Sequence, residues 1–412
     1  MQNSSEPNRL EPHATQLINR SRSIIFDFNG TSIRAFDGDT IASALYANGV
    51  RIFSRSFKYH RPRGLLCVAG NCPNCLMTVD GEPNVRVCTR SVRSGMHVQH
   101  QNAWPSLEWD VISVLDRIDW MLPVGFYYKA LHKPKILWRI AEPIIRRIAG
   151  LGSINFDSPQ DSRYVHTYLH TDILIVGGGL AGMSAALAVA ERGLDVILVD
   201  DQSVLGGYLR LDTSIYNDVV GVDTSAGHEI ARLFASQIAT SSRIRVFPNS
   251  TAFGFYEGNL IGIIAGNQMI KLRANQVVIA TGSYETPTIF EKNDMAGVML
   301  SSAAQRLIHL YGIKPGSTAL VTTSSDQGYN VTLDLVKAGI KIAAIADSRR
   351  GFPGDLDAAK ELQAKGVLTL SSHAPVRAEG AKRVQGGVVA RISEDRLTTE
   401  ERQFDCDLIC AT

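Results

Sequence analysis

Alternating apolar and polar positions predict short strands in the first hundred residues of the chain. The stretch 23–50 indicates two strands that turn at Asn29-Gly30 and a helix that starts after Thr40. A second pair of strands flanks Asp80-Gly81. The predicted order is therefore strand pair, helix, cysteine-containing loop and further strands.

The pattern changes twice further along the chain. Residues 104–150 have helical spacing and bulky apolar side chains, broken by Pro123, Pro134 and Pro143, which predicts a helical connector packed on its neighbours. A membrane-surface helix is the alternative there, because arginines flank the apolar positions. From Thr171 onward, apolar strands alternate with helices in two successive cycles, which predicts parallel α/β architecture.

Composition narrows the class of protein. A length of 412 residues predicts two or three domains, and 42 basic against 40 acidic residues leave a net charge of +2, which implies no nucleic-acid partner. The first twenty residues contain no apolar run of the kind that a secretory signal needs. Residues 173–190 carry no charge, but their regularly spaced glycines favour a nucleotide-binding turn over a membrane span.

Four of the six cysteines lie in 22 residues, which predicts a metal centre in a reducing, cytoplasmic setting. The spacing of Cys67, Cys72 and Cys75 is C-x4-C-x2-C, and Cys88 follows. This is the plant-type ferredoxin spacing for a [2Fe–2S] cluster. Zinc would need a second C-x2-C knuckle, and a redox pair would need a strand–helix context, so both alternatives are weaker.

The residues around these cysteines suit a cluster. Ala69, Gly70 and Asn71 are small enough to let backbone N–H groups approach the sulfurs. The basic segment 51–64 before them is either a solvated loop or a positive docking face for an acidic partner. Cys406 and Cys410 lie in an apolar strand and are predicted to be core residues.

A glycine-rich turn follows the first strand of the first α/β cycle. Its G-x-G-x-x-G spacing between a strand and a helix predicts a dinucleotide whose pyrophosphate binds at the helix N-terminus. An acid eighteen residues later, at the end of the next strand, would bind the ribose and favours FAD or NAD over NADP. The apolar strand ending in Ala-Thr-Gly at 280–282 resembles a strand of flavoproteins with two dinucleotide-binding domains, and this resemblance favours FAD. The predicted cofactor-binding residues are Gly177, Gly178, Gly179, Ala181, Gly182, Asp200, Asp201, Gly206, Gly207, Ala280, Thr281 and Gly282.

The second α/β cycle is a weaker nucleotide site. The stretch TTSSDQG at 322–328 has Thr and Ser where glycines are expected, so the domain either binds a nicotinamide nucleotide or is a degenerate structural domain. Asp347 would suit NAD, and Arg349 and Arg350 would suit a phosphate. The last strand, 407–412, ends before the expected glycine, which predicts that the chain is the N-terminal part of a longer protein.

Several motifs resemble the alpha subunit of heterotetrameric sarcosine oxidase and the related amine dehydrogenases. They are FKYHRPRG at 57–64, NAWPSLEWDV at 102–111, LPVGFYYK at 122–129, EPIIRRIAGLG at 142–152 and DSR at 347–349. The resemblance implies a partner subunit that oxidises an amine at its own flavin. It also implies a tetrahydrofolate-binding half after the part present here. The oxidase alpha subunit lacks the cluster cysteines and binds NAD, so the four cysteines favour the dehydrogenases and leave FAD against NAD open.

The predicted fold is α/β. It comprises a ferredoxin-like β-grasp [2Fe–2S] domain (20–100), a helical connector (101–168), a Rossmann-like FAD- or NAD-binding domain (169–312) and a second, incomplete nucleotide-binding-like domain (313–412).

The predicted function is that of an oxidoreductase, the electron-transferring subunit of a hetero-oligomeric amine-oxidising flavoenzyme. The amine would give a hydride to flavin, and the cluster would accept electrons one at a time. No catalytic base is predicted, and His60, His97, His100, His166 and His170 are interpreted as surface or core residues. The alternatives are an NAD(P)H-dependent reductase that feeds a partner and a non-catalytic cofactor-binding subunit.

Overall fold

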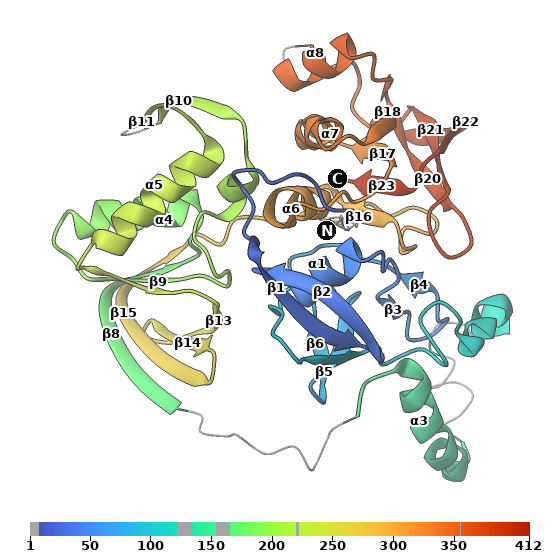
Figure 1. Cartoon of the computed structure of the whole chain (residues 1–412), viewed down its shortest axis with the longest axis horizontal. Coiled ribbons are helices and arrows are strands. Elements are labelled where there is room, and N and C mark those ends of the chain that lie inside the picture. Colours follow the sequence, from blue (N-terminus) through green and yellow to red (C-terminus); the bar gives the residue numbers. More distant parts are fainter. Residues whose placement is uncertain (1–7, 122–124, 126–132, 154–164, 220–221, 355) are drawn as a thin grey trace. The chain divides into compact units, whose positions relative to one another are not determined.

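The structure of the chain is a computed structural model that describes residues 8–121, 125, 133–153, 165–219, 222–354 and 356–412 (Figure 1). It forms two compact units, one of Met1–Ser158 with Glu285–Thr412 and one of Pro159–Tyr284. This division places 285–312 with the C-terminal region, whereas the sequence pattern groups it with the first nucleotide-binding domain. The predicted domain boundaries stay predictions.

A five-stranded sheet forms the N-terminal part of the first unit, in the order β2-β1-β7-β5-β6. The β1–β2 hairpin turns at Asn29 and Gly30, which both have positive φ, as a tight hairpin turn requires. Thr40 and Ser43 form a capping box that starts α1, and all seven residues of α1 are buried. The β-grasp order predicted from the sequence is confirmed. The elements are β1 (Asn19–Phe28), β2 (Thr31–Asp37), α1 (Ile41–Ala47), β3 (Ser54–Arg55), β4 (Pro62–Arg63), β5 (Leu76–Val79), β6 (Glu82–Arg86) and β7 (His97–Gln99).

The connector contains a 3₁₀ helix, η1 (Val111–Met121), and a helix, α3 (Lys135–Ala149). Pro134 is the N-cap of α3, as the break predicted there requires, but the helix continues through Pro143, so the break predicted at Pro143 is wrong. None of the α3 residues is buried, so the predicted packing of this helix on its neighbours is also wrong. Pro123, the motif at 122–129 except Gly125, and the segment 154–164 lie outside the described residues.

The second unit is a six-stranded sheet in the order β12-β9-β8-β15-β14-β13. Alternate residues of its strands point to opposite faces. Ile175 and Leu198 pack with α4 and α5 on one face, whereas Leu174 and Ile197 pack with β14 and β15 residues on the other. The elements are β8 (Val165–Val176), α4 (Leu180–Ala190), β9 (Val196–Val199), η2 (Gly207–Leu211), β10 (Ile215–Val219), β11 (Val222–Ala226), α5 (Gly227–Thr240), β12 (Ile244–Phe247), β13 (Ser250–Tyr256), β14 (Leu260–Ala265) and β15 (Gln268–Ile279).

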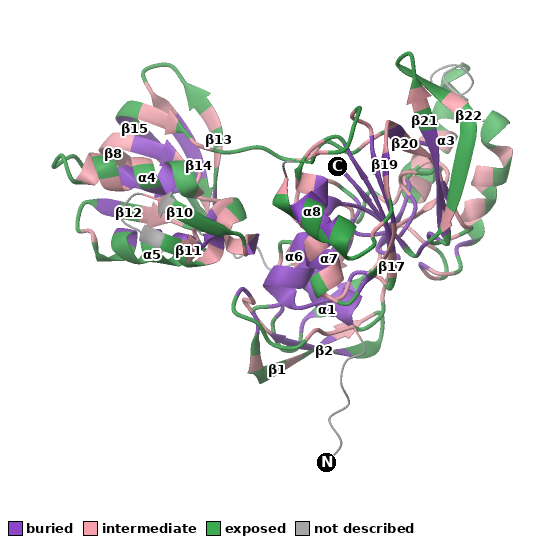
Figure 2. Cartoon of the chain, turned by 90° about the horizontal axis from the view of Figure 1, so that it is seen from above, coloured by how far each residue is buried: buried purple, intermediate pink, exposed green. Residues whose placement is uncertain are grey.

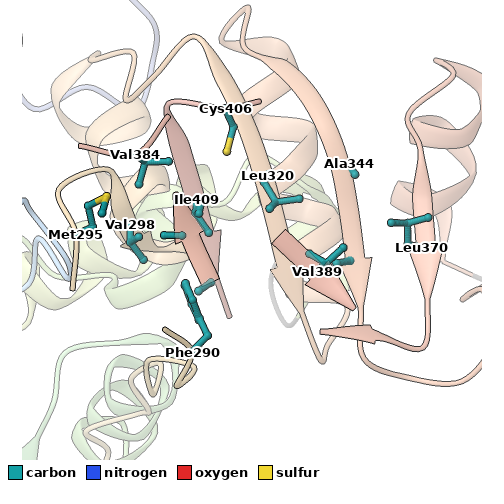
Figure 3. Packing of buried hydrophobic residues seen from close by; sticks show 13 residues of the cluster. Phe290, Met295, Val298, Leu320, Ala344, Leu370, Val384, Val389, Cys406 and Ile409 are labelled. Atoms are coloured by element: carbon teal, nitrogen blue, oxygen red, sulfur yellow. The ribbon is translucent and has the colours of Figure 1, made fainter. Parts of the chain in front are cut away.

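The C-terminal part of the first unit is a parallel sheet in the order β16-β23-β17-β18-β19, beside a three-stranded antiparallel sheet. Cys406 packs in a buried cluster with Leu320, Ile409 and Val389 (Figure 3), and Cys410 is fully buried, which confirms both cysteines as core residues. The elements are β16 (Val298–Leu300), α6 (Ser301–Tyr311), β17 (Thr318–Thr323), α7 (Gln327–Lys337), β18 (Lys341–Asp347), α8 (Asp357–Ala364), β19 (Thr369–Ser371), β20 (His373–Glu379), β21 (Gly386–Ser393), β22 (Arg396–Asp405) and β23 (Leu408–Ala411).

The two parts of the first unit are joined through buried polar contacts, and α1 and α6 lie where they meet (Figure 1, Figure 2). The Tyr46 hydroxyl donates to the Pro315 carbonyl at 2.5 Å. Next to the cysteine loop, the Leu300 N–H donates to the Leu66 carbonyl at 2.9 Å. The residue before Cys67 is therefore fixed to β16. Among the helices that the structure describes, none has the length and apolar character needed to cross a membrane.

Candidate cofactor sites

Four thiols meet in the loop between β4 and β5 and just after β6. The sulfurs of Cys67 and Cys72 are 3.3 Å apart, and Cys88 hydrogen-bonds to both Cys67 and Cys75. None of the four forms a disulfide. The structure thus brings together all four residues that the sequence selects as metal ligands.

Hydrogen bonding in this group divides the four thiols, because it favours negative charge on Cys67 and Cys75 and the protonated form of Cys72 and Cys88. Hydrogen bonds from Cys72 and Cys88 lower the pKa of the Cys67 thiol to about 2, against the effect of burial. The same hydrogen bonds, together with burial, raise the pKa of the thiols of Cys72 and Cys88, which act as donors. Backbone N–H groups of Ala69 and Asn71 contact the Cys67 sulfur and further lower its pKa. Donors aimed at sulfur are what an anionic cluster needs around it.

The loop backbone also fits a cluster. Gly70 has a φ of +77°, and its N–H donates to the Cys88 sulfur at 3.3 Å. A Cβ at this position would lie 2.9 Å from Cγ2 of Thr89, so only glycine brings this N–H close. No group of three or more His, Cys, Asp or Glu side chains in the described part of the chain is arranged to hold a metal ion. What the structure shows for the four cysteines is their mutual contacts, and their role as cluster ligands stays a prediction.

The basic segment before the cysteines is mostly paired within the chain. The buried Arg55 guanidinium donates to the carbonyls of Leu107 and His60, the latter at 3.0 Å, and Arg61 pairs with Asp116 at 2.6 Å. Arg55 is therefore neither a solvated residue nor part of a docking face, and both interpretations are wrong for it. Its role is to fix the connector to the loop.

His60 is a core residue with a specific partner. Its ring is buried and its Nδ1 lies 2.6 Å from the Asp110 carboxylate. Burial raises the pKa of Asp110, but hydrogen bonds from His60 and the Trp104 N–H outweigh this and lower it. The sequence analysis missed this pair, because no spacing rule connects residues 50 positions apart.

The first glycine-rich turn lies at the carboxyl edge of the second unit's sheet, where β8, β9 and β15 end. The order β9-β8-β15 makes this the point where successive strands leave on opposite sides, which is where α/β sheets bind ligands. Gly177 has a φ of +109°, and a Cβ there would lie 2.2 Å from the Ala280 carbonyl oxygen. At Gly182 a Cβ would lie 1.8 Å from the Gly177 carbonyl oxygen. Only glycine fits at these two positions, because any side chain there would collide with the backbone of the turn and of the neighbouring strand.

Gly179 differs from the other glycines of this turn. A Cβ at Gly179 would meet only the Cα of Gly207, at 3.9 Å. Gly179 is the N-cap of α4, so the space beside it faces the free N–H groups of that helix. Such a cradle is the place where a pyrophosphate would approach, and the residues present fit a dinucleotide.

Asp200 lies at the same edge and already faces the turn. Its carboxylate accepts the Gly178 N–H at 2.5 Å and the Gln202 N–H at 2.8 Å. Burial raises the pKa of Asp200, although both hydrogen bonds lower it. Among the other predicted residues, Gly206 donates to the Gly178 carbonyl, whereas Ala181, Asp201, Thr281 and Gly282 are exposed around the turn.

The corresponding position in the C-terminal sheet holds protein side chains instead. Asp326 is the N-cap of α7, so a carboxylate stands where a dinucleotide would place its pyrophosphate. Asp347, at the end of β18, is fully buried and accepts from the Tyr329 hydroxyl at 3.0 Å. Arg349 links the two acids, at 2.7 Å from Asp326 and 2.8 Å from Asp347.

This network favours one of the two interpretations that the sequence left open for the second domain, that of a degenerate structural domain. Asp347 and Arg349 pair with each other, so a ribose or a phosphate bound here would have to displace one of these contacts. Tyr329 and Asp326 were missed. The signal available was Asp326 itself, an acid in a turn where a phosphate site needs glycine.

Comparison with known families agrees with these two sites. The family described as "2Fe-2S iron-sulfur cluster binding domain" matches residues 21–103, and the family described as "Pyridine nucleotide-disulphide oxidoreductase" matches residues 171–412. The matches support the two expected cofactors, a [2Fe–2S] cluster and FAD.

Individual relatives cover most of this chain. Sarcosine oxidase subunit alpha of Rhizobium meliloti (strain 1021) is 36% identical over 352 residues, which are 81% of this chain and 35% of that protein. The subunit alpha of Corynebacterium sp. (strain P-1) is 28% identical over 99% of this chain and 39% of that protein. The chain thus spans well under half the length of these relatives.

The fold has a solved counterpart. The match to the crystal structure of L-proline dehydrogenase from P. horikoshii covers 98% of this chain and 62% of the dehydrogenase chain. It has a TM-score of 0.65 and 20% sequence identity. An identity this low shows the shared fold only. Taken with the family matches, the chain belongs to the pyridine nucleotide-disulphide oxidoreductase family, contains an N-terminal 2Fe-2S domain and is an oxidoreductase homologous to sarcosine oxidase alpha subunits.

Proposed function

We propose that the chain is the electron-transferring alpha subunit of an amine-oxidising flavoenzyme complex in the reducing cytoplasm. The observation that supports this most is the presence of two different redox-cofactor sites in one chain, one of four thiols and one of a glycine-rich turn. Its similarity to sarcosine oxidase alpha subunits supports an amine such as sarcosine as the substrate of the complex.

When bound, the flavin exchanges electron pairs and the cluster exchanges single electrons, which suits conversion from two-electron to one-electron transfer. The protein supplies the surroundings. Gly179 leaves room for the pyrophosphate at the α4 N-terminus, and Asp200 provides the acceptor for ribose hydroxyls. N–H groups of Ala69, Gly70 and Asn71 stabilise charge on the cysteine sulfurs.

The Asp326–Arg349–Asp347 network argues against the NAD(P)H-dependent reductase considered as an alternative. A nicotinamide nucleotide would have to displace a carboxylate from the α7 N-terminus and separate Arg349 from a fully buried acid. We propose that electrons instead reach this chain from the flavin of a partner subunit. Tetrahydrofolate, as acceptor of the one-carbon unit, is proposed only for the complete protein.

The first test is to purify the chain anaerobically and record visible absorption, then EPR after dithionite. Absorption over roughly 400–550 nm and a rhombic signal on reduction are expected for a [2Fe–2S] centre. Colourless protein that holds zinc, and that stays colourless after reconstitution with iron and sulfide, would contradict the proposal.

The second test uses the chain co-expressed with its flavin-containing partner subunit. Anaerobic addition of sarcosine or another secondary amine should produce the cluster EPR signal, and NADH should not. A cluster that neither amine nor NADH reduces would favour the non-catalytic alternative, and reduction by NADH alone would favour the reductase.

A further inference from the structure

The helix α3 exposes an apolar stripe that nothing in the described chain covers. Ile140 and Ile144 are 61% and 55% exposed, and Leu137 lies on the same face three residues before Ile140. An amphipathic helix of a globular protein ordinarily buries such a stripe. In Figure 1, α3 stands beside the sheet of the ferredoxin-like domain and not on it.

The tryptophans of the protein share one stretch of the sequence. The sequence contains four, and all of them lie in the connector. Trp104, Trp109 and Trp120 are 65%, 74% and 77% exposed, although Nζ of Lys382 lies 4.0 Å from the centroid of the Trp109 ring, and Trp138 is in α3. Tryptophan is costly to leave in water and is enriched at the energetic centres of protein interfaces, so its confinement to one exposed segment points to an interface.

The helix is nevertheless held in a defined direction. The carbonyls at its C-terminal end would otherwise lack partners. Those of Ile148, Gly150 and Leu151 accept hydrogen bonds from His60 at 2.8 Å, Gln101 at 3.2 Å and Asn84 at 2.8 Å. All three donors belong to the ferredoxin-like domain or its immediate end. The apolar stripe is therefore presented on a fixed support.

The fixed end of α3 lies close to the cysteine loop. Ala149 of α3 and Pro73, which stands between Cys72 and Cys75, line one cleft of about 210 Å³. A molecule that covers α3 would therefore also approach the cysteines. A cleft suits a protruding side chain of a protein better than it suits the flat surface of a bilayer.

Charge indicates the kind of molecule. The polar side of α3 contains Lys135, Arg139, Arg146 and the one acid, Glu142, and Arg147 lies on the apolar side seven residues after Ile140, so the helix has a net charge of 4 − 1 = +3. Glu142 pairs with Arg146 at 3.3 Å. The complementary surface is an apolar groove with acidic side chains on its rim.

We propose that α3 forms the docking surface for the flavin-containing partner subunit, which places the partner beside the cysteine loop that would hold the [2Fe–2S] cluster. This rests on the proposed function, because that function requires such a partner. The surface gives the cluster an electron donor within reach, and it explains why a soluble-domain helix leaves isoleucines in water.

The test is the Ile140→Glu/Ile144→Glu double variant, co-expressed with the flavin-containing partner subunit. Because both side chains are exposed, the fold should persist, and the isolated variant should keep the iron content, FAD content and cluster EPR of the parent chain. Its affinity for the partner should fall at least about thirtyfold. The matched control is Ile25→Glu/Ile289→Glu, which changes isoleucines that are 58% and 92% exposed elsewhere and should bind normally.

Three outcomes would overturn the inference. Unchanged affinity of the double variant would exclude α3 as the docking surface while leaving amine-dependent cluster reduction, and hence the proposed function, intact. A parent chain that holds its cluster but binds no partner would remove the docking role. Flotation of the parent chain with phosphatidylglycerol vesicles, lost in the double variant, would assign α3 to an anionic membrane instead.

Discussion

Two sheet edges of this chain have the same strand–turn–helix arrangement but different side chains. The first edge is where β8 and β9 end and α4 begins, and the second is where β17 and β18 end and α7 begins. At the first, Gly179 leaves space beside the α4 N-terminus, and the Asp200 carboxylate accepts the N–H groups of Gly178, in the glycine-rich turn, and of Gln202. At the second, Asp326 stands at the α7 N-terminus and Arg349 ties it to Asp347. The first edge therefore has space that suits a dinucleotide, whereas at the second edge the charged side chains pair with one another.

The difference teaches that a nucleotide site is a local property and not a property of the fold. Gly328 still approaches the Thr323 side chain, with a notional Cβ 2.4 Å away, just as Gly182 approaches Gly177. The glycine that lets helix and strand pack is thus present in both. An acid also ends the strand at both edges, Asp200 and Asp347, so the difference lies in the N-cap of the helix and in what the acid is paired with.

The largest effect is expected from Gly179→Ala. The new methyl group meets nothing closer than the Gly207 Cα at 3.9 Å, so the protein accepts it, but it occupies the space of the pyrophosphate. We expect FAD to bind at least about a hundredfold more weakly, near 2.8 kcal/mol. Equilibrium dialysis with FAD, followed by flavin fluorescence, measures this.

A glycine elsewhere gives the control for that variant. Gly354 has no atom within 4 Å of a notional Cβ, so Gly354→Ala should leave FAD binding unchanged. Gly179→Ala protein that binds FAD as tightly as the parent chain would mean that the turn is not the pyrophosphate site. Cluster EPR should be the same in all three proteins.

The next effect concerns the second edge and is one of stability. Arg349→Ala leaves the fully buried Asp347 with the Tyr329 hydroxyl but without its cation. Loss of one partner of a buried pair costs about 3–5 kcal/mol, and we expect about 2 kcal/mol because Arg349 is itself partly exposed. Differential scanning calorimetry should show a lower unfolding temperature, and FAD binding at the first edge should be unaffected.

A second arginine variant, at an exposed ion pair, shows whether the destabilisation by Arg349→Ala is due to the buried acid or merely to the loss of a positive charge. Arg350 pairs with Asp395, but both side chains are almost fully exposed, so Arg350→Ala should change stability by well under about 1 kcal/mol. Equal destabilisation by both variants would show that the network around Asp347 is not special.

The first edge was predictable from sequence because its determinants are contiguous. A strand, four glycines and a helix occupy 173–190, and the three glycines of the G-x-G-x-x-G motif can each be assigned a steric reason. The cysteine loop was predictable for the same reason, since three ligands fall in nine residues and Cys88 follows one hairpin later.

The second edge and the connector were not predictable in the same way. Tyr329 reaches Asp347 across 18 positions and His60 reaches Asp110 across 50, and such pairs depend on tertiary placement that no periodicity records. The helical spacing of apolar residues in α3 was predictable. That spacing implies that the apolar stripe is covered, but it does not identify the molecule or segment that covers it.

A smaller effect is expected from Tyr329→Phe. The hydroxyl is buried and donates to Asp347 at 3.0 Å, and burial together with this carboxylate raises the pKa of Tyr329. Removal of one hydrogen bond while Arg349 remains should cost about 1 kcal/mol. Chemical denaturation, followed at a probe in the C-terminal sheet, would detect it. A loss as large as that of Arg349→Ala would mean that the hydroxyl, and not the guanidinium, holds the acid.

The smallest expected effect is a pH dependence of FAD binding that comes from Asp200 and not from Asp347. Burial raises the pKa of Asp200, so the folded second unit binds this proton more tightly than the unfolded chain. Its stability is therefore highest below the unfolded pKa, near 3.9, and falls as the pH rises through the raised folded value. FAD binding should show the opposite trend, because an ionised Asp200 accepts ribose hydroxyls more strongly than a protonated one.

We therefore expect FAD affinity to fall by about fivefold as the pH is lowered through the pKa of Asp200, since a hydrogen bond to a charged acceptor exceeds a neutral one by about 1 kcal/mol. Asp200→Asn should remove this pH dependence, and Asp347→Asn should leave it intact because that acid is neutralised by Arg349 in the other unit. Dialysis against FAD at several pH values measures all three proteins. If Asp347→Asn also abolished the pH dependence, the second edge would take part in FAD binding. The contrast between the first edge, which has space for a dinucleotide, and the second edge, whose charged side chains pair with one another, would then no longer hold.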